Sequence, residues 1–214
     1  MKQWAIDLTE AVETLNRAGV VNRFVRPETI VLSNTRDDYA RPQLASFDFA
    51  CLYWDTATDA TVPLKPRGLP IPSLATHLLG HLPPECFTDG YDGSMVDVWS
   101  IGTVILQLLT GNSPFKPPNL AKVGRDEPIE MDDYIKQWKR SEERRIIPEE
   151  IRSLLDDVFV EANSRMTAWE MAKDFRLTCK TTRHFLKERL TPYYRIDLAK
   201  VNRLMSHQLV SYRN

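Results

Sequence analysis

The chain has 214 residues, of which 43% are hydrophobic and 27% charged, and its formal net charge is −1. These values fit a soluble globular protein whose core is large enough to stand without disulfides. A charge so near zero excludes a protein that is drawn to nucleic acids or membranes by its overall charge. The charge is unevenly placed, however, because residues 178–214 hold eight basic and two acidic side chains.

The cysteines Cys51, Cys86 and Cys179 show no metal-binding spacing, and their odd number without a disulfide framework indicates a reducing compartment. His77 and His81 lie four residues apart, but no Glu or Cys completes a metal site nearby, so we expect none. No signal peptide opens the chain, and no apolar run approaches membrane-spanning length. We therefore expect a cytoplasmic or nuclear protein that does not contact a membrane.

The first half of the chain mixes one helix with short extended runs. Residues 3–17 have apolar side chains at helical spacing and are followed by Gly19, which predicts a helix. The β-branched runs VVNRF and ETIVLS, and the alternating QLASFDF at 43–49, predict strands or extended loops. Residues 50–84 show little periodicity and hold six prolines, which is typical of a functional or mobile segment.

The second half of the chain is predicted to be helical. The strongest pattern, VDVWSIGTVILQLLTG at 96–111, is apolar nearly all round and indicates a helix buried in the core. Further helices are predicted over 131–140, 148–160 and 167–177, the last with a T-x-x-E capping box at its start. The basic tail carries two more helical patterns, TRHFLKERL and IDLAKVNRLMSHQL.

Five segments follow one another along the chain: NRFVRPET at 22–29, DFA at 48–50, PPE at 83–85, YDGSMVDVWSIGTVILQLLTGNSPF at 91–115 and NSRMT at 163–167. Their order resembles the catalytic loop, D-F-G, A-P-E, core helix and late D-P-x-x-R-x-T element of eukaryotic Ser/Thr protein kinases, especially the calmodulin-dependent type. The resemblance implies a mainly α fold: a kinase C-lobe-like helical domain with a short β-hairpin. We expect this domain over residues 1–177 and a basic helical tail over 178–214.

The first segment departs from the family pattern at the positions that the resemblance marks as catalytic. Phe24 stands at the Asp that orients the substrate hydroxyl, and Thr29 stands at the Asn that binds a metal ion. Arg26 replaces the loop lysine, which keeps the charge but changes the geometry. Asn22 and Arg23 stand at the His and Arg of the motif, and we expect Arg23 to be a structural donor rather than a phosphate reader.

The second segment keeps one residue of the metal-binding type. Asp48 is either a vestige of that function or a hydrogen-bonded loop acid, and we favour the loop acid. Phe49 follows it, and Ala50 in place of a glycine removes backbone freedom, which indicates a segment fixed in one conformation. Because one carboxylate alone is a weak Mg²⁺ site, we expect no catalytic residue, no metal and no cofactor.

Residues that the resemblance implies are architectural remain in place. Asp97 lies twelve residues after Glu85, at the head of the buried helix, where the family's aspartate accepts hydrogen bonds from catalytic-loop amides. Glu85 and Arg165 match the family's buried ion pair. The sequence thus keeps what the fold needs.

Two surfaces are candidate interfaces. The chain starts at the helix before the catalytic loop, so the resemblance implies that the N-lobe, with its Gly-rich loop and ATP-binding Lys, is absent. Its absence would expose the cleft floor, with Val31 and Phe49 as candidate contact residues. On the helix over 131–140 the candidates are Tyr134, Ile135 and Trp138, with packing on the chain's own domain as an equal alternative.

These observations favour a catalytically inactive pseudokinase, not an enzyme, that serves as a protein–protein interaction scaffold or regulator. The expected partner is another protein, such as a kinase or an N-lobe-like chain, or a second copy meeting the exposed cleft floor. One alternative is a phosphotransferase half completed in trans by a separate N-lobe chain. Another is a nucleic-acid adaptor acting through the basic tail, which we regard as the weaker reading.

Overall fold

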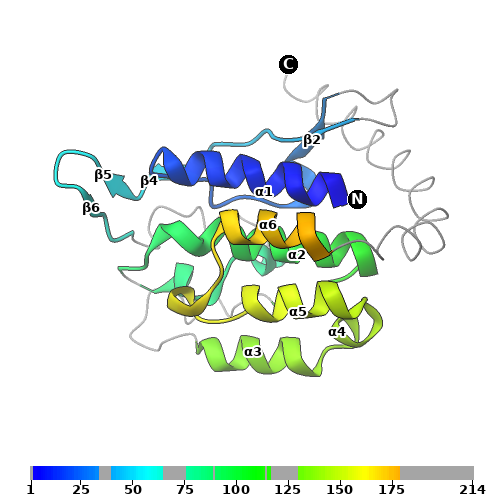
Figure 1. Ribbon diagram of the computed structural model, residues 1–214. Coiled ribbons are helices and arrows are strands. Elements are labelled where there is room, and N and C mark those ends of the chain that lie inside the picture. Colours follow the sequence, from blue (N-terminus) through cyan, green and yellow to red (C-terminus); the bar gives the residue numbers. More distant parts are fainter. Residues whose placement is uncertain are drawn as a thin grey trace, which may run out of the picture. The chain divides into compact units, whose positions relative to one another are not determined.

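A computed structural model describes residues 2–33, 40–64, 76–88, 90–113, 115–116 and 130–178. This part of the chain is mainly helical and adds short pairs of antiparallel strands, as Figure 1 shows. The mainly α character and the β-hairpin agree with the expected fold class. The tail after Thr178 lies outside the described residues, so its helices and the boundary at 177 stay predictions.

The helices lie close to where their patterns predict them. The α-helices are α1 (Lys2–Arg17), α2 (Val96–Thr110), α3 (Met131–Arg140), α4 (Glu142–Ile146), α5 (Glu149–Val158) and α6 (Ala168–Thr178). Short 3₁₀ helices are η1 (Pro27–Thr29), η3 (Thr76–His81), η4 (Pro84–Phe87), η5 (Gly93–Met95) and η6 (Ala162–Ser164). The predicted capping box forms at the start of α6, because the Glu170 carboxylate accepts from the Thr167 amide (2.8 Å) while the Thr167 hydroxyl accepts from the Glu170 amide (3.2 Å).

The strands are shorter than their patterns predict. The antiparallel pairs are β1 (Val20–Val21) with β4 (Cys51–Leu52), β2 (Ile30–Leu32) with β3 (Pro42–Leu44), and β5 (Trp54–Asp55) with β6 (Ala60–Thr61). The expected strand over 43–49 ends at Leu44, because the chain turns and the Ala50 amide bonds the Phe47 carbonyl at 3.0 Å. Strand β1 ends at Val21 because the next two amides bond a side chain instead of a neighbouring strand.

Helix α2 is the centre of the core, as its apolar pattern predicts. Most of its side chains are buried, including Trp99 at 0% exposure, and its C-terminus is closed by Gly111 in a left-handed conformation. The span Gly93–Thr110 is apolar and long enough to cross a membrane by composition, which corrects our expectation that no such run exists. However, 72% of that span is buried inside the protein, as is typical of the core helix of a folded domain.

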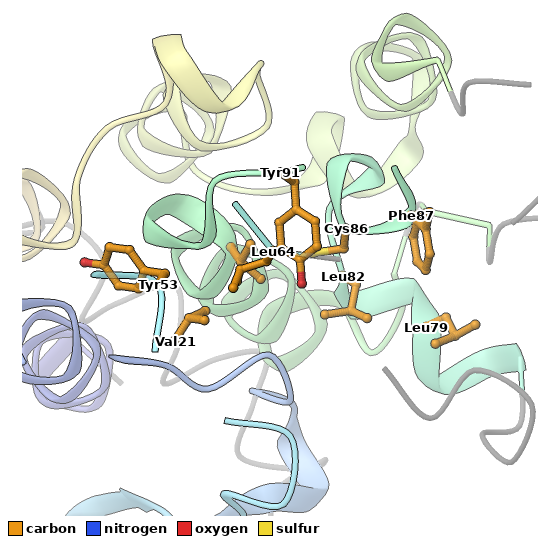
Figure 2. Packing of buried hydrophobic residues seen from close by; sticks show 9 residues of the cluster. Val21, Tyr53, Leu64, Leu79, Leu82, Cys86, Phe87 and Tyr91 are labelled. Carbon is orange, nitrogen blue, oxygen red and sulfur yellow. The ribbon is translucent and has the colours of Figure 1, made fainter. Parts of the chain in front are cut away.

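A second buried cluster joins the start of α2 to the segments before it (Figure 2). Its members come from β1, from positions 53 and 64, from η3, η4 and the residues that follow each of them, and from α2: Val21, Tyr53, Leu64, Leu79, Leu82, Cys86, Phe87, Tyr91 and Val96. Tyr53, Leu64 and most of residues 79–88 are therefore packed on the core, although their sequence shows little periodicity, whereas residues 56–63 are exposed. Helix α1 packs against α6 (Figure 1) and also contacts β3 and α2.

Candidate functional site

The candidate site is built on the buried carboxylate of Asp97 in the first turn of α2. Asp97 Oδ2 accepts a hydrogen bond from the Asn22 amide (2.6 Å), and Oδ1 accepts one from the Arg23 amide (2.9 Å). Burial raises the pKa of Asp97 to about 6, against the lowering effect of these two amides and of the Arg23 charge. One side chain of the core helix thus fixes the start of the loop over 22–29.

Arg23 ties this loop to the two segments that follow it. Its Nε donates to the Phe49 carbonyl (2.7 Å), and its Nη1 donates to the Tyr91 hydroxyl (3.2 Å). Its backbone has a positive φ of 61°, a conformation that costs free energy for a side chain of this size and persists only where the surroundings hold it. The side chain is buried and serves as the structural donor that the sequence led us to expect.

An aromatic and cationic stack occupies the position where the resemblance implies a catalytic carboxylate. The Phe24 ring meets the Phe49 ring edge to face, with centroids 4.5 Å apart and planes at 75°. The guanidinium of Arg26 lies over the Phe24 ring, with Cζ 4.2 Å from the centroid. Burial lowers the pKa of Arg26, and Glu28 opposes that shift. The stack joins the loop over 22–29 to the D-F-A segment.

The other two polar side chains of the loop bond its backbone. The Thr29 hydroxyl accepts from the Arg26 amide (3.2 Å) and lies within donating distance of the Phe24 carbonyl (2.8 Å). Asn22 donates through Nδ2 to the Ser46 carbonyl (2.7 Å), and its Oδ1 accepts from the Phe24 amide (3.0 Å). Both side chains therefore shape the loop, and Asn22 also holds it against residues 45–50.

Asp48 presents its carboxylate at the surface beside this stack. Its Oδ2 accepts from the Ser46 hydroxyl at 2.8 Å, and the residue is exposed. Among the described residues no three His, Cys, Asp or Glu side chains gather in a way that could hold a metal ion. Asp48 could therefore hold Mg²⁺ only if phosphate oxygens of a nucleotide supplied further ligands.

Glu85 and Arg165 form an ion pair across the domain, with Nη1 and Oε1 2.6 Å apart. The Arg165 side chain is fully buried and also donates to the carbonyls of Val158, Met95 and Val160 at 2.8–3.0 Å. One guanidinium thus holds η4, the start of α2 and the end of α5 together.

The structure separates the residues of the two candidate interfaces. Val31 is half-buried in β2, where it pairs with Gln43, and Phe49 is half-buried in the stack described above. On α3, Tyr134 and Trp138 are 4% and 1% exposed, because their rings pack on Trp99 and Phe159 of the core. Tyr134 and Trp138 are therefore not available to contact a partner, and Ile135, the third candidate on α3, is half-buried.

His81 is a buried structural residue. Its Nδ1 lies 2.9 Å from the Thr103 hydroxyl, and burial lowers its pKa to about 4. It is therefore neutral near pH 7 and bound to the core helix. The side chain of His77 lies outside the described part of the structure.

Sequence reasoning missed two features. The first is the bond between Tyr91 and Arg23, which no spacing rule marks because the two residues are 68 positions apart. The second is a shallow groove of about 520 Å³ between the end of α1 and the start of α6. Its walls are formed by Glu13, Asn16, Arg17, Tyr53, Ser94, Met95, Thr167, Ala168 and Trp169. The Trp169 ring on its wall is 50% exposed, which the sequence does not show.

Comparison with known proteins finds similarity to protein kinases, as the order of the motifs led us to expect. Residues 1–175 match the family described as protein kinase domain. The chain is 28% identical to the serine/threonine-protein kinase unc-51 of Caenorhabditis elegans over 64% of its length, and 31% identical to the human serine/threonine-protein kinase ULK1 over 50%. It is 32% identical to CBL-interacting protein kinase 32 of Oryza sativa subsp. japonica over 53%. These matches span 16%, 9% and 23% of the respective relatives.

These findings contradict our expectation that the chain is not an enzyme. The matching family and all three relatives are protein kinases by their names, so they point to a kinase enzyme. The expectation rested on Phe24 and Thr29 at two catalytic positions and on the lack of a Gly-rich loop and an ATP-binding Lys in the 214 residues. That expectation treated the loss of the catalytic carboxylate as the loss of the reaction. In phosphoryl transfer, however, positioning and electrostatic stabilisation supply most of the catalysis.

Proposed function

Because this chain belongs to the protein kinase family, we propose that it takes part in phosphoryl transfer from a nucleotide to serine or threonine residues of proteins. The observation that supports this most directly is the arrangement around Asp97. Its carboxylate fixes the loop over 22–29, and Arg23 fixes that loop to Phe49, the neighbour of Asp48. The positions at which the family orients the hydroxyl and holds the metal are thereby brought to one place.

The roles follow from the side chains present. Asp48 would hold a Mg²⁺ ion together with the phosphates of the nucleotide, and the metal would neutralise charge that develops on the transferred phosphoryl group. Phe24 cannot accept a proton, so this chain forgoes general-base assistance, which contributes about 10²–10⁴-fold in rate. The 214 residues contain no G-x-G-x-x-G loop, and we propose that a separate N-lobe-like chain supplies the phosphate-covering elements.

Restoring the carboxylate tests this proposal. Phe24→Asp should raise the rate of phosphate transfer from Mg²⁺–ATP to a mixed Ser/Thr peptide substrate by about 10²-fold or more, because the new group can orient the hydroxyl and take its proton. The assay measures labelled phosphate on the peptide, with and without an isolated N-lobe-like chain supplied as the second chain. Asp48→Asn should abolish transfer in both backgrounds.

Phe24→Asn is the matched control, because it introduces a polar side chain without a proton acceptor of comparable basicity. It should leave the rate near that of the wild type. If the wild type and Phe24→Asp both stay at the background of an enzyme-free mixture, with and without the second chain, the proposal fails.

A second candidate function is a scaffold or regulator that binds another protein through the cleft floor. Partly exposed apolar side chains support it: Phe24, Val31 and Phe49 are half-buried, and Phe47 is 47% exposed. The partner we propose is a kinase or an N-lobe-like chain, or a second copy of this chain. Such a role is compatible with phosphoryl transfer by the same site.

Capture of partners on immobilised protein tests this second function. Val31→Asp should lose a protein that the wild type retains, because a charge placed among apolar side chains opposes their burial in an interface. Ile146→Asp is the matched control, since Ile146 is 38% exposed on α4, a different element. Equal capture and equal oligomeric state for all three proteins would exclude the cleft floor as the binding surface.

A further inference from the structure

The carboxylate of Asp48 is held by one side chain, the hydroxyl of Ser46. Ser46 Oγ donates to Asp48 Oδ2 at 2.8 Å, while Oδ1 accepts no hydrogen bond from the residues that the structure describes. Asp48 is exposed, whereas Ser46 is half-buried. The bond therefore ties a surface carboxylate to a residue that lies closer to the core.

Ser46 is itself fixed by the loop over 22–29. Its carbonyl accepts from Asn22 Nδ2 at 2.7 Å, and the Asn22 amide donates to the buried Asp97 carboxylate at 2.6 Å. Asn22 is 1% exposed, so its side of both bonds is shielded from water. A series of hydrogen bonds thus leads from the core helix α2 through Asn22 and Ser46 to the carboxylate of Asp48.

The backbone around this serine is fixed at two further points. The Ala45 amide donates to the Thr29 carbonyl at 3.0 Å, and the Phe49 carbonyl accepts from Arg23 Nε at 2.7 Å. The segment over 45–50 is therefore anchored to the loop near both of its ends. What remains free is the rotation of the acidic side chain in this segment, and the serine hydroxyl restricts that rotation.

We propose that Ser46 is a positioning residue for Mg²⁺ binding, because its hydroxyl holds Asp48 Oδ2 and leaves Oδ1 available to the metal. The proposal rests on the proposed phosphoryl transfer, in which Asp48 holds Mg²⁺ together with the phosphates of the nucleotide. Mg²⁺ demands near-octahedral geometry, so a carboxylate that is oriented beforehand binds it at a smaller cost in side-chain entropy. Hydrogen-bond partners of metal ligands contribute about 10–100-fold in metal affinity or activity.

The rest of the site makes the orientation of this carboxylate decisive. Thr29 stands where the resemblance implies a second protein ligand, and its hydroxyl is engaged with the loop backbone. With Asp48 as the one protein ligand, any freedom of its side chain lowers the affinity for the metal directly. Loss of the Ser46 hydroxyl should therefore weaken metal binding by about 10-fold. It should leave the fold intact, because water can replace a hydrogen bond to an exposed carboxylate.

Mn²⁺–ATP is the probe, because Mn²⁺ substitutes for Mg²⁺ and broadens the NMR signals of nearby nuclei. As it is added to the full chain, the amide signals of Phe49 and Ala50 should broaden and saturate, with Mg²⁺–ATP as the diamagnetic reference. The half-saturating concentration should rise by about 10-fold in Ser46→Ala. It should return to near the wild-type value in Ser46→Thr, which restores the hydroxyl. Asp48→Asn should abolish the saturable broadening.

Thr58→Ala is the matched control, because the Thr58 hydroxyl donates to Asp55 Oδ2 at 2.9 Å, an exposed bond of the same kind in the β5–β6 hairpin. This variant should bind Mn²⁺–ATP like the wild type. Equal affinity of Ser46→Ala and the wild type would overturn the proposal, and so would a Ser46→Thr protein that binds as weakly as Ser46→Ala. Broadening in Asp48→Asn equal to that in the wild type would overturn it too, because Asp48 would then not hold the metal.

The dependence of phosphate transfer on Mg²⁺ separates this inference from the proposed function. In the Phe24→Asp background, Ser46→Ala should act mainly on the half-maximal Mg²⁺ concentration, which should rise by about 10-fold. If Ser46→Ala changes neither this concentration nor the binding of Mn²⁺–ATP while phosphate is transferred, the inference fails and the proposed function stands. If Ser46→Ala weakens the binding of Mn²⁺–ATP but no variant transfers phosphate, the positioning role stands and the proposed function fails.

Discussion

Asp97 is the residue at which the pH dependence of stability can be argued. Its pKa in the folded protein, about 6, lies above its ordinary value of 3.8, so the folded state holds this proton more tightly than the unfolded state. The stability that Asp97 contributes is therefore fully present below about pH 4, falls as the pH rises to about 6, and is constant above. The slope for one such group approaches about 1.4 kcal/mol per pH unit.

Asp97→Asn should remove this slope. At pH 7 the variant should also lose about 1–3 kcal/mol, because its amide group turns a donor toward one of the two loop amides that Asp97 now accepts. Urea unfolding between pH 4.5 and 7.5 measures both effects, and the difference between wild type and variant isolates Asp97 from other titrating groups. Parallel curves for the two proteins would contradict the assignment.

At the scale of residues, the resemblance to kinase motifs singled out Asp97, Glu85 and Arg165. The structure brings the latter two together. The backbone bonds of the Thr29 hydroxyl and the bond between Arg23 and Tyr91 could not be predicted. They depend on how distant segments meet, which a single sequence does not encode in any local pattern.

Helix α2 offers a prediction at the scale of elements. An Ala normally stabilises a helix interior over a Gly by about 1 kcal/mol. At Gly102, however, an added Cβ would lie 2.7 Å from Val158 Cγ1 and 3.0 Å from Phe159 Cε1. Gly102→Ala should therefore destabilise the protein by about 1–3 kcal/mol, measured by urea unfolding, because α2 and the end of α5 approach too closely for a methyl group.

The control for Gly102→Ala is a second substitution that makes room. Val158→Ala alone leaves a cavity and costs stability, but combined with Gly102→Ala it should cost at least about 1 kcal/mol less than the sum of the two single changes. Additive losses, or a more stable Gly102→Ala protein, would mean that the close packing of α2 on α5 is not what keeps a glycine at this position.

Elements with a strong period were predictable, and those shaped by single contacts were not. Helix α2 and the amphipathic helices α1, α3, α5 and α6 follow from their apolar spacing. The five-residue helix α4 is too short to show a period, and it is fixed by the Ser141 hydroxyl, which accepts from the Arg144 amide at 3.1 Å. Strands β1 and β3 end early because side-chain acceptors and a turn take over from strand pairing.

At the scale of the whole molecule, Arg165 links segments that lie far apart in the chain. It joins Glu85, 80 residues earlier, to the carbonyls of Met95, Val158 and Val160. Arg165→Met should cost about 3–5 kcal/mol, because it leaves the largely buried Glu85 carboxylate and three carbonyls without their donor. Glu85→Gln should cost less, since it removes the charge but keeps an oxygen that can accept from Arg165. Thermal and urea unfolding measure both losses.

The exposed pair of Arg17 and Glu13 is the matched control for this argument. Its atoms are also 2.6 Å apart, but the Arg17 side chain is 76% exposed. Arg17→Met should change the free energy of unfolding by less than about 0.5–1 kcal/mol, because water screens the pair and replaces its hydrogen bonds. Equal losses for Arg165→Met and Arg17→Met would mean that distance alone sets the strength of these pairs. A much larger loss of stability for Arg165→Met than for Arg17→Met, with Glu85→Gln between the two, would mean that burial and the three carbonyl acceptors make the Arg165 pair strong.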